Sequence, residues 1–248
     1  MRKIIVVVNQ KGGVGKTTSV INIASSLTKR NKKVLVVDLD PQGNATTGSG
    51  IDKINLTNSI YDVLINNQDV ATTIVHASKC AFDILPANRH LAGAEIELVS
   101  MESREYRLKD ALNTIRDRHD VIIIDCPPSL GLLTLNALSC ADYLLVPIQC
   151  EYYALEGLTD LLTTIKRLKA SLNPNLELIG LIRTMYDKRN NLATQVSEQL
   201  ITHFGDKVFK TYIPRNVRLA EAPSFGISAV MLDSGSLGSQ AYLNEQMN

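Results

Sequence analysis

The stretch NQKGGVGKTT, Asn9 to Thr18, determines how the rest of the chain is interpreted. It follows the apolar run IIVVV at residues 4–8 and leads into a segment whose apolar residues have helical spacing. The stretch nearly matches the phosphate-binding pattern GxxxxGK(S/T), but Gln10 replaces the first glycine and a second lysine, Lys11, lies inside the loop. A strand, a glycine-rich loop and a helix in this order predict a nucleotide site, and the second lysine needs its own explanation.

The loop residues have distinct chemical roles in such a site. The glycines let the backbone curl so that its N–H groups face a phosphate, and the helix beginning at Lys16 adds a positive dipole end. Lys16 supplies positive charge to the β- and γ-phosphates, and the Thr17 hydroxyl is placed to ligate Mg²⁺. ATP and Mg²⁺ are therefore the predicted cofactors. The predicted nucleotide-binding residues of the loop are Lys11, Gly12, Gly13, Val14, Gly15, Lys16, Thr17 and Thr18.

Apolar runs that alternate with helix-period segments set the fold class. Strand-like runs rich in β-branched residues occupy residues 4–8, 34–37, 82–85, 121–124, 143–148, 178–182 and 208–213. The helical stripes between them are Val20, Ile23, Ala24 and Leu27; Leu158, Leu161, Leu162, Ile165 and Leu168; and Leu192, Val196, Leu200 and Ile201. We predict an α/β fold, a single-domain P-loop NTPase over residues 1–248, with a mostly parallel twisted sheet and helices on both faces. Residues 92–118 are predicted to form a polar helix or helix pair.

Composition disfavours several classes of protein. With 248 residues, 45% hydrophobic and 21% charged, the chain resembles an ordinary soluble domain, and no apolar run approaches the roughly 18 residues of a membrane span. We therefore expect a cytoplasmic protein with no membrane partner. The four cysteines have no CxxC spacing, which favours free thiols over a zinc or iron–sulfur site. A net charge of +1 gives no global case for nucleic-acid binding, so any such function requires a local basic patch.

Two acidic strand ends should lie beside the loop, because ligands of such sheets gather at the carboxyl ends of the strands. Asp125 ends an apolar run, as a Walker-B aspartate does, and is predicted to hold Mg²⁺ together with Thr17. Asp38 and Asp40 follow another run, and strand alternation puts both on one face. Pro41 should stop this strand just after Asp40, which places Asp40 nearer the phosphates. We assign Asp40 to orienting the attacking water and Asp38 to supporting it.

Five motifs, spread from Ile4 to about Tyr242, give the chain a family resemblance. They are KGGVGKTT, VDLDPQGNAT, IIIDCPPSLG, QCEYYALEGL and IPRNVRLAEAPSFG. Together they resemble the ParA/Soj chromosome-partitioning ATPases, within the deviant-Walker class of P-loop proteins that also contains MinD and the nitrogenase iron protein. The resemblance implies that ATP drives formation of a homodimer with two nucleotides sandwiched between its subunits, and that slow hydrolysis resets it.

The resemblance also implies roles for individual residues. In similar proteins the additional loop lysine, here Lys11, reaches across a two-fold axis to the ATP of the partner subunit. Pro214 and Asn216 in the IPRN motif then lie near the adenine and ribose, and Asp40 is the hydrolytic residue. Lys11, Lys16 and Asp40 are accordingly the expected catalytic residues.

Two partners are implied as well. One is double-stranded DNA, bound without sequence preference by the ATP dimer, and the other is a ParB-like centromere-binding protein that stimulates hydrolysis. Basic clusters occur at residues 166–169, 187–189 and 214–218, and each alone is consistent with ordinary solvated charge. The resemblance selects as DNA-binding candidates Arg189 and Arg218, followed by Lys188 and Arg215. A nucleoid-associated protein is the expected result.

Two other functions stay open. A MinD-like positioning ATPase binds membranes through a basic amphipathic C-terminal helix, but the tail SLGSQAYLNEQMN at residues 236–248 has no lysine or arginine. A metabolic P-loop enzyme, such as a kinase or an ATP-dependent ligase, needs an acceptor pocket with its own base and polar groups, and no such constellation is evident. The strand before the phosphate loop begins at once, so neither a helix-turn-helix domain nor sequence-specific operator binding is expected.

Overall fold

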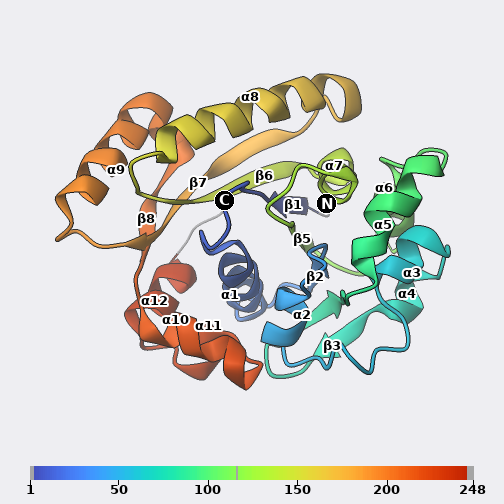
Figure 1. Ribbon diagram of the computed structural model, residues 1–248. Helices are drawn as coiled ribbons and strands as arrows, with labels where there is room; N and C mark the ends of the chain where they lie inside the picture. Colours follow the sequence, from blue (N-terminus) through green and yellow to red (C-terminus); the bar gives the residue numbers. More distant parts are fainter. Residues whose placement is uncertain (1–2, 116, 245–248) are drawn as a thin grey trace.

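One sheet of eight strands runs through the computed structural model of the protein, which describes residues 3–115 and 117–244 (Figure 1). The strands are β1 (Lys3–Val7), β2 (Val34–Asp38), β3 (Val75–Ala77), β4 (Phe82–Leu85), β5 (Val121–Asp125), β6 (Tyr143–Gln149), β7 (Glu177–Tyr186) and β8 (Val208–Pro214). Their order across the sheet is β3-β4-β2-β5-β1-β6-β7-β8, and neighbouring strands are parallel except for the antiparallel pair β3 and β4. The predicted α/β fold with a mostly parallel sheet is confirmed, and β1 lies centrally, between β5 and β6.

Helices cover both faces of the sheet, as predicted. The α-helices are α1 (Lys16–Thr28), α2 (Asn44–Gly48), α3 (Ile60–Ile65), α4 (Val70–Thr73), α5 (Leu91–Glu97), α6 (Arg107–Asn113), α7 (Leu132–Cys140), α8 (Ala154–Leu172), α9 (Asn191–Phe204), α10 (Val217–Glu221), α11 (Ala229–Leu232) and α12 (Leu237–Asn244), and the short 3-10 helices are η1 (Leu98–Ser100), η2 (Gly205–Lys207) and η3 (Ala222–Phe225). In Figure 1, α7, α8 and α9 lie above the sheet, whereas α1 and α10 to α12 lie below it. Within the described ranges, no helix is both long enough and apolar enough to cross a membrane.

Strand alternation builds one apolar core on each face of the sheet. In β1, Ile4 and Val6 pack into the core shared with α3 and α5 to α9. Ile5 and Val7 point the other way and pack with α1, α2 and α10 to α12. Because both faces are buried, the strands are continuous apolar runs in the sequence, which is why the sheet can be predicted from them.

Two details differ from the expectations based on sequence. The edge strand β3 was not predicted, because its three residues, VHA, are too few and too polar to form an apolar run. The helix pair predicted for residues 92–118 is confirmed as α5 and α6, which are separated by η1 and a turn; residue 116 lies outside the described residues. In α9, Leu192 and Ile201 are exposed, so their assignment to the buried stripe is wrong. The buried stripe of α9 includes Ala193, Val196, Ser197 and Leu200, and Leu192 and Ile201 flank it.

Candidate nucleotide site

The glycine-rich loop leaves the carboxyl end of the central strand β1 and is fixed there by Asn9. The Asn9 Oδ1 atom accepts a hydrogen bond from the Lys11 backbone N–H at 2.9 Å. The Asn9 Nδ2 atom donates to the Pro147 carbonyl of β6 at 2.7 Å. Asn9 therefore ties the start of the loop to the neighbouring strand, a role that the sequence pattern did not suggest.

The backbone of the loop forms an open cradle. Gly13 and Gly15 have φ angles of 74° and 85°, in the left-handed region that favours glycine. A Cβ atom added at Gly12 or Gly13 would meet no heavy atom within 4 Å, so space lies beside this backbone. The first turn of α1 has no side-chain cap at Gly15, which leaves its N–H groups available to an anion. The loop has the geometry that a phosphate group requires.

Lys16 lies at the base of this cradle and is almost fully buried, with 7% of its surface exposed. Its Nζ atom donates a hydrogen bond to the Lys11 carbonyl at 3.2 Å. Burial lowers the pKa of Lys16, and the nearby carboxylates of Asp125 and Asp40 oppose this effect. A desolvated ammonium group in this position attracts a phosphate strongly, because little water screens its charge.

Thr17 and Asp125 meet beside the cradle, as a magnesium site requires. The Thr17 hydroxyl donates to Asp125 Oδ2 at 2.7 Å. Asp125 is fully buried, and among the described residues its Oδ1 atom has no hydrogen-bond partner. Burial, and then the charge of Asp38, raise the pKa of Asp125 well above its usual range. A hydroxyl and a buried carboxylate with an unsatisfied oxygen fit Mg²⁺, which prefers oxygen ligands and would neutralise charge on nucleotide phosphates.

Asp38 and Asp40 have different surroundings. Asp38 is fully buried and accepts hydrogen bonds from the Thr46 N–H, the Thr46 hydroxyl and the Asp40 N–H, at 2.8, 2.7 and 3.1 Å. Burial raises the pKa of Asp38 to about 6. β2 ends at Asp38, so the expectation that this strand continues to Asp40 is wrong, and the hydrogen bonds to Asp38 hold the turn that follows. Asp40 is partly exposed, and its Oδ1 atom accepts the Gln42 N–H at 2.9 Å.

A cavity of about 850 Å³ brings most of the predicted nucleotide residues together. Its lining includes Gly12, Gly13, Gly15, Lys16, Thr17, Thr18, Asp40, Pro214, Arg215 and Asn216. Val14 is buried, and Lys11 points away to form an ion pair with Glu151. Arg189 and Arg218 are exposed and lie outside this lining. The structure therefore separates two of the predicted DNA-binding residues from the nucleotide cavity, whereas Arg215 lines it.

Sequence reasoning missed two residues that support the cavity. The Thr184 hydroxyl, near the end of β7, donates to the Val14 carbonyl of the phosphate loop at 2.7 Å. Tyr242 of α12 shares a hydrogen bond of 2.9 Å with the Ser19 hydroxyl of α1. Both residues line the cavity. Position alone offered a signal for Thr184, because it lies just beyond an apolar run, at the sheet edge where ligands bind.

The fold and the site define a P-loop ATPase: a phosphate cradle after a central strand, a buried lysine, and a threonine–aspartate pair whose geometry fits magnesium. The family model described as an AAA domain matches residues 2–178. The chain is 52% identical over 244 residues to the sporulation initiation inhibitor protein Soj of Bacillus subtilis, covering 98% of this chain and 96% of that protein. It is 50% identical over 242 residues to the chromosome partitioning protein ParA of Myxococcus xanthus, covering 97% and 85%. The chain belongs to the ParA/Soj family of chromosome-partitioning ATPases, with ATP and Mg²⁺ as cofactors, as predicted.

Solved structures agree with this assignment of the fold. A putative plasmid partition protein from Borrelia burgdorferi, bound to AMPPNP, has a TM-score of 0.82 at 30% identity and covers 98% of this chain and 96% of that one. Cobyrinic acid a,c-diamide synthase from Mycobacterium smegmatis, with bound ADP and magnesium, has a TM-score of 0.83 at 40% identity and covers 91% and 93%. The second of these is named as a synthase rather than as a partition protein.

Proposed function

We propose that this partitioning ATPase forms an ATP-bound homodimer that binds double-stranded DNA without sequence preference, and that a ParB-like centromere-binding protein stimulates its hydrolysis. Relatives named as chromosome partitioning proteins support the proposal. The observation that carries it is that the two strands whose ends line the nucleotide cavity also lead into the basic segments proposed to bind DNA. Thr184, near the end of β7, and Pro214, at the end of β8, line the nucleotide cavity, and the basic residues lie in the segments that follow these two strands. A nucleotide that contacts these strand ends would therefore also act on the basic loops.

The basic residues proposed to bind DNA come from two neighbouring segments. Tyr186 of β7 is paired in register with Pro214 of β8, so the loops after both strands begin at the same sheet edge. Lys188 Nζ lies 5.1 Å from the centre of the Tyr212 ring, a contact between the first loop and β8. The positive charge of Arg215 in the second loop adds to the effect of Arg189 in lowering the pKa of Asp187 in the first loop. This arrangement supports one basic surface rather than two unrelated clusters.

Lys11 supports the proposed dimer. Its ammonium group forms an ion pair with Glu151, and both side chains are about half exposed. An exposed pair of this kind contributes only about 0.2–1 kcal/mol, so Lys11 can leave it at little cost. Lys16 already provides the buried positive charge within the same cradle. A second cation that arrives from another subunit would neutralise triphosphate charge that one subunit leaves uncompensated.

We predict that Lys11→Ala binds ATP but stays monomeric, because the change removes the proposed contact across the dimer and leaves the cradle and Lys16 in place. Size-exclusion chromatography with light scattering, with and without ATP and Mg²⁺, measures this directly. Lys29→Ala, an exposed lysine beyond the other end of α1, is the matched control and should dimerise like the wild type. Normal ATP-dependent dimerisation of Lys11→Ala would contradict the role proposed for this lysine.

We predict that Arg189→Glu and Arg218→Glu each abolish DNA binding while ATP-dependent dimerisation survives. With about three phosphate contacts per subunit, a monomer has a salt slope of about −2.7 and a dimer about −5.4, so only the dimer binds usefully. Fluorescence anisotropy with a non-specific duplex at about 100 mM salt tests this, because such contacts still matter there. Lys166→Glu, the same charge reversal at an exposed position of α8, is the control. If both arginine variants bind DNA like the wild type, the proposed surface is wrong.

One observation favours a second candidate function, an ATP-dependent metabolic ligase. The synthase structure named above is 40% identical to this chain, although the named partitioning relatives reach 48–52%. ATP turnover separates the two candidates. A partitioning ATPase should be stimulated by DNA together with a cognate centromere-binding protein, and a ligase by cobyrinic acid with an amide donor. Stimulation by cobyrinic acid and an amide donor, with no effect of DNA and the centromere-binding protein, would favour the ligase and contradict our proposal.

A further inference from the structure

Arg189, one of the two arginines proposed to contact DNA, is already paired with a carboxylate of its own loop. Its Nε atom lies 3.0 Å from Asp187 Oδ1 and its Nη2 atom 2.8 Å from Asp187 Oδ2. Hydrogen bonding from Arg189 lowers the pKa of Asp187 to about 2. The Arg189 side chain is 90% exposed, so this bidentate ion pair lies on the surface rather than in the core.

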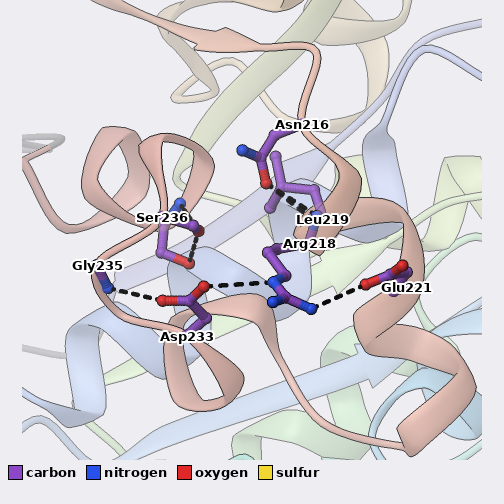
Figure 2. A network of polar contacts seen from close by, with 8 residues as sticks. Asn216, Arg218, Leu219, Glu221, Asp233, Gly235 and Ser236 are labelled. Carbon is purple, nitrogen blue, oxygen red and sulfur yellow. Dashed lines mark hydrogen bonds and ion pairs between the residues drawn. The ribbon is translucent and has the colours of Figure 1, made fainter.

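Arg218 is held by two carboxylates, as Figure 2 shows. Its Nη1 atom lies 3.2 Å from Glu221 Oε2, and its Nε atom lies 3.3 Å from Asp233 Oδ2. Glu221 ends α10, whereas Asp233 directly follows α11 and also accepts the Gly235 N–H through its other oxygen. The guanidinium group is therefore held between two segments of the chain, with its charge facing acidic groups.

We propose that Asp187, Glu221 and Asp233 are internal counter-ions that compete with DNA phosphates for Arg189 and Arg218 and so limit the affinity for DNA. The inference rests on the proposed DNA-binding function. A carboxylate and a phosphate offer an arginine the same paired oxygen acceptors, so one contact excludes the other. Exposed ion pairs contribute little to folding, which makes a purely stabilising role for these three carboxylates a poor explanation.

The size of the effect follows from the strength of an exposed ion pair. Such a pair corresponds to about a 1.4- to 5-fold change in an equilibrium constant. A dimer contains two copies of each arginine. Neutralising the counter-ions of either Arg189 or Arg218 should therefore tighten DNA binding by about 2- to 25-fold. The salt dependence should change little, because the same number of phosphates is contacted.

The test compares Asp187→Asn and the double variant Glu221→Gln/Asp233→Asn with the wild type. The amides keep the shape of each side chain, and their oxygen atoms can still accept the backbone N–H groups of Arg189 and Gly235. Matched controls are Asp206→Asn and Glu198→Gln/Asp206→Asn, which remove the same charges at exposed positions in η2 and α9. The dissociation constant for a non-specific duplex is measured with AMPPNP and Mg²⁺ present.

We expect each neutralised variant to bind DNA about 2- to 25-fold more tightly than its control. Affinity equal to the control, or weaker, would overturn the inference, and weaker binding would assign the carboxylates to positioning the arginines. Failure of the proposed function gives a different pattern, because wild-type protein would then bind no DNA and Arg189→Glu would change nothing. If the wild type binds DNA through its arginines and the neutral variants match their controls, only the counter-ion inference fails.

Discussion

Asp40→Ala is expected to lower ATP turnover by about 100-fold or more while ATP still binds and the ATP-bound dimer accumulates. The phosphate cradle, Lys16 and the threonine–aspartate pair are untouched by this change. What is lost is the carboxylate that we assign to orienting the attacking water. Steady-state phosphate release measures the turnover, and light scattering after ATP addition measures the dimer.

Asp52→Ala is a suitable control for this variant. Asp52 is an exposed carboxylate beyond α2, engaged with Ile54 and Asn55 in its own turn. The Asp52→Ala variant should hydrolyse ATP like the wild type. Wild-type turnover in Asp40→Ala itself would remove Asp40 from the mechanism.

The choice between Asp40 and Asp38 rests on their hydrogen bonds. Asp38 is committed to Thr46 and to the Asp40 backbone, and it is fully buried. Asp40 borders the nucleotide cavity. Its Oδ1 atom accepts the Gln42 N–H, and its Oδ2 atom accepts no hydrogen bond from the described residues. A water molecule can therefore approach Asp40 but not Asp38, whose part is to hold the turn that carries Asp40.

Local patterns predicted the phosphate loop and every strand of the sheet except β3, because the physics behind these patterns is local. Continuous apolar runs mark strands buried on both faces, and the GKTT sequence has few structural alternatives between a strand and a helix. Pro214 and Asn216 lie about 200 residues from the loop, yet both line its cavity. Their placement depended on family resemblance, since no spacing rule links segments so far apart in the chain.

The remaining contacts depend on tertiary structure that no local pattern contains. Thr184 reaches Val14 only because β7 and the phosphate loop meet at one sheet edge. The pairing of Arg218 with Asp233 joins residues on either side of α11. By contrast, Asp187 and Arg189 are two positions apart, and their pairing was visible in the DKR motif. The prediction for this motif used only its positive charges and did not include the carboxylate of Asp187.

Lys16→Ala is expected to weaken ATP binding by about 10- to 150-fold, the loss that follows from removing charge-assisted hydrogen bonds to phosphate. The lysine is buried beside two carboxylates, and burial lowers its pKa. Its removal relieves a desolvation cost in the folded protein, so the fold itself should survive. The loss should therefore appear in nucleotide binding and not in the stability of the protein without nucleotide.

Thermal unfolding with and without ATP and Mg²⁺ distinguishes these effects. A ligand at 100 times its dissociation constant stabilises a protein by about 2.7 kcal/mol, so the wild type should show a clear rise in melting temperature. Lys16→Ala should melt near the wild-type temperature without nucleotide and lose most of the rise with it. Lys29→Ala, beyond the far end of the same helix, should keep the full rise. A full ATP-dependent rise in Lys16→Ala would mean that another cation holds the phosphates.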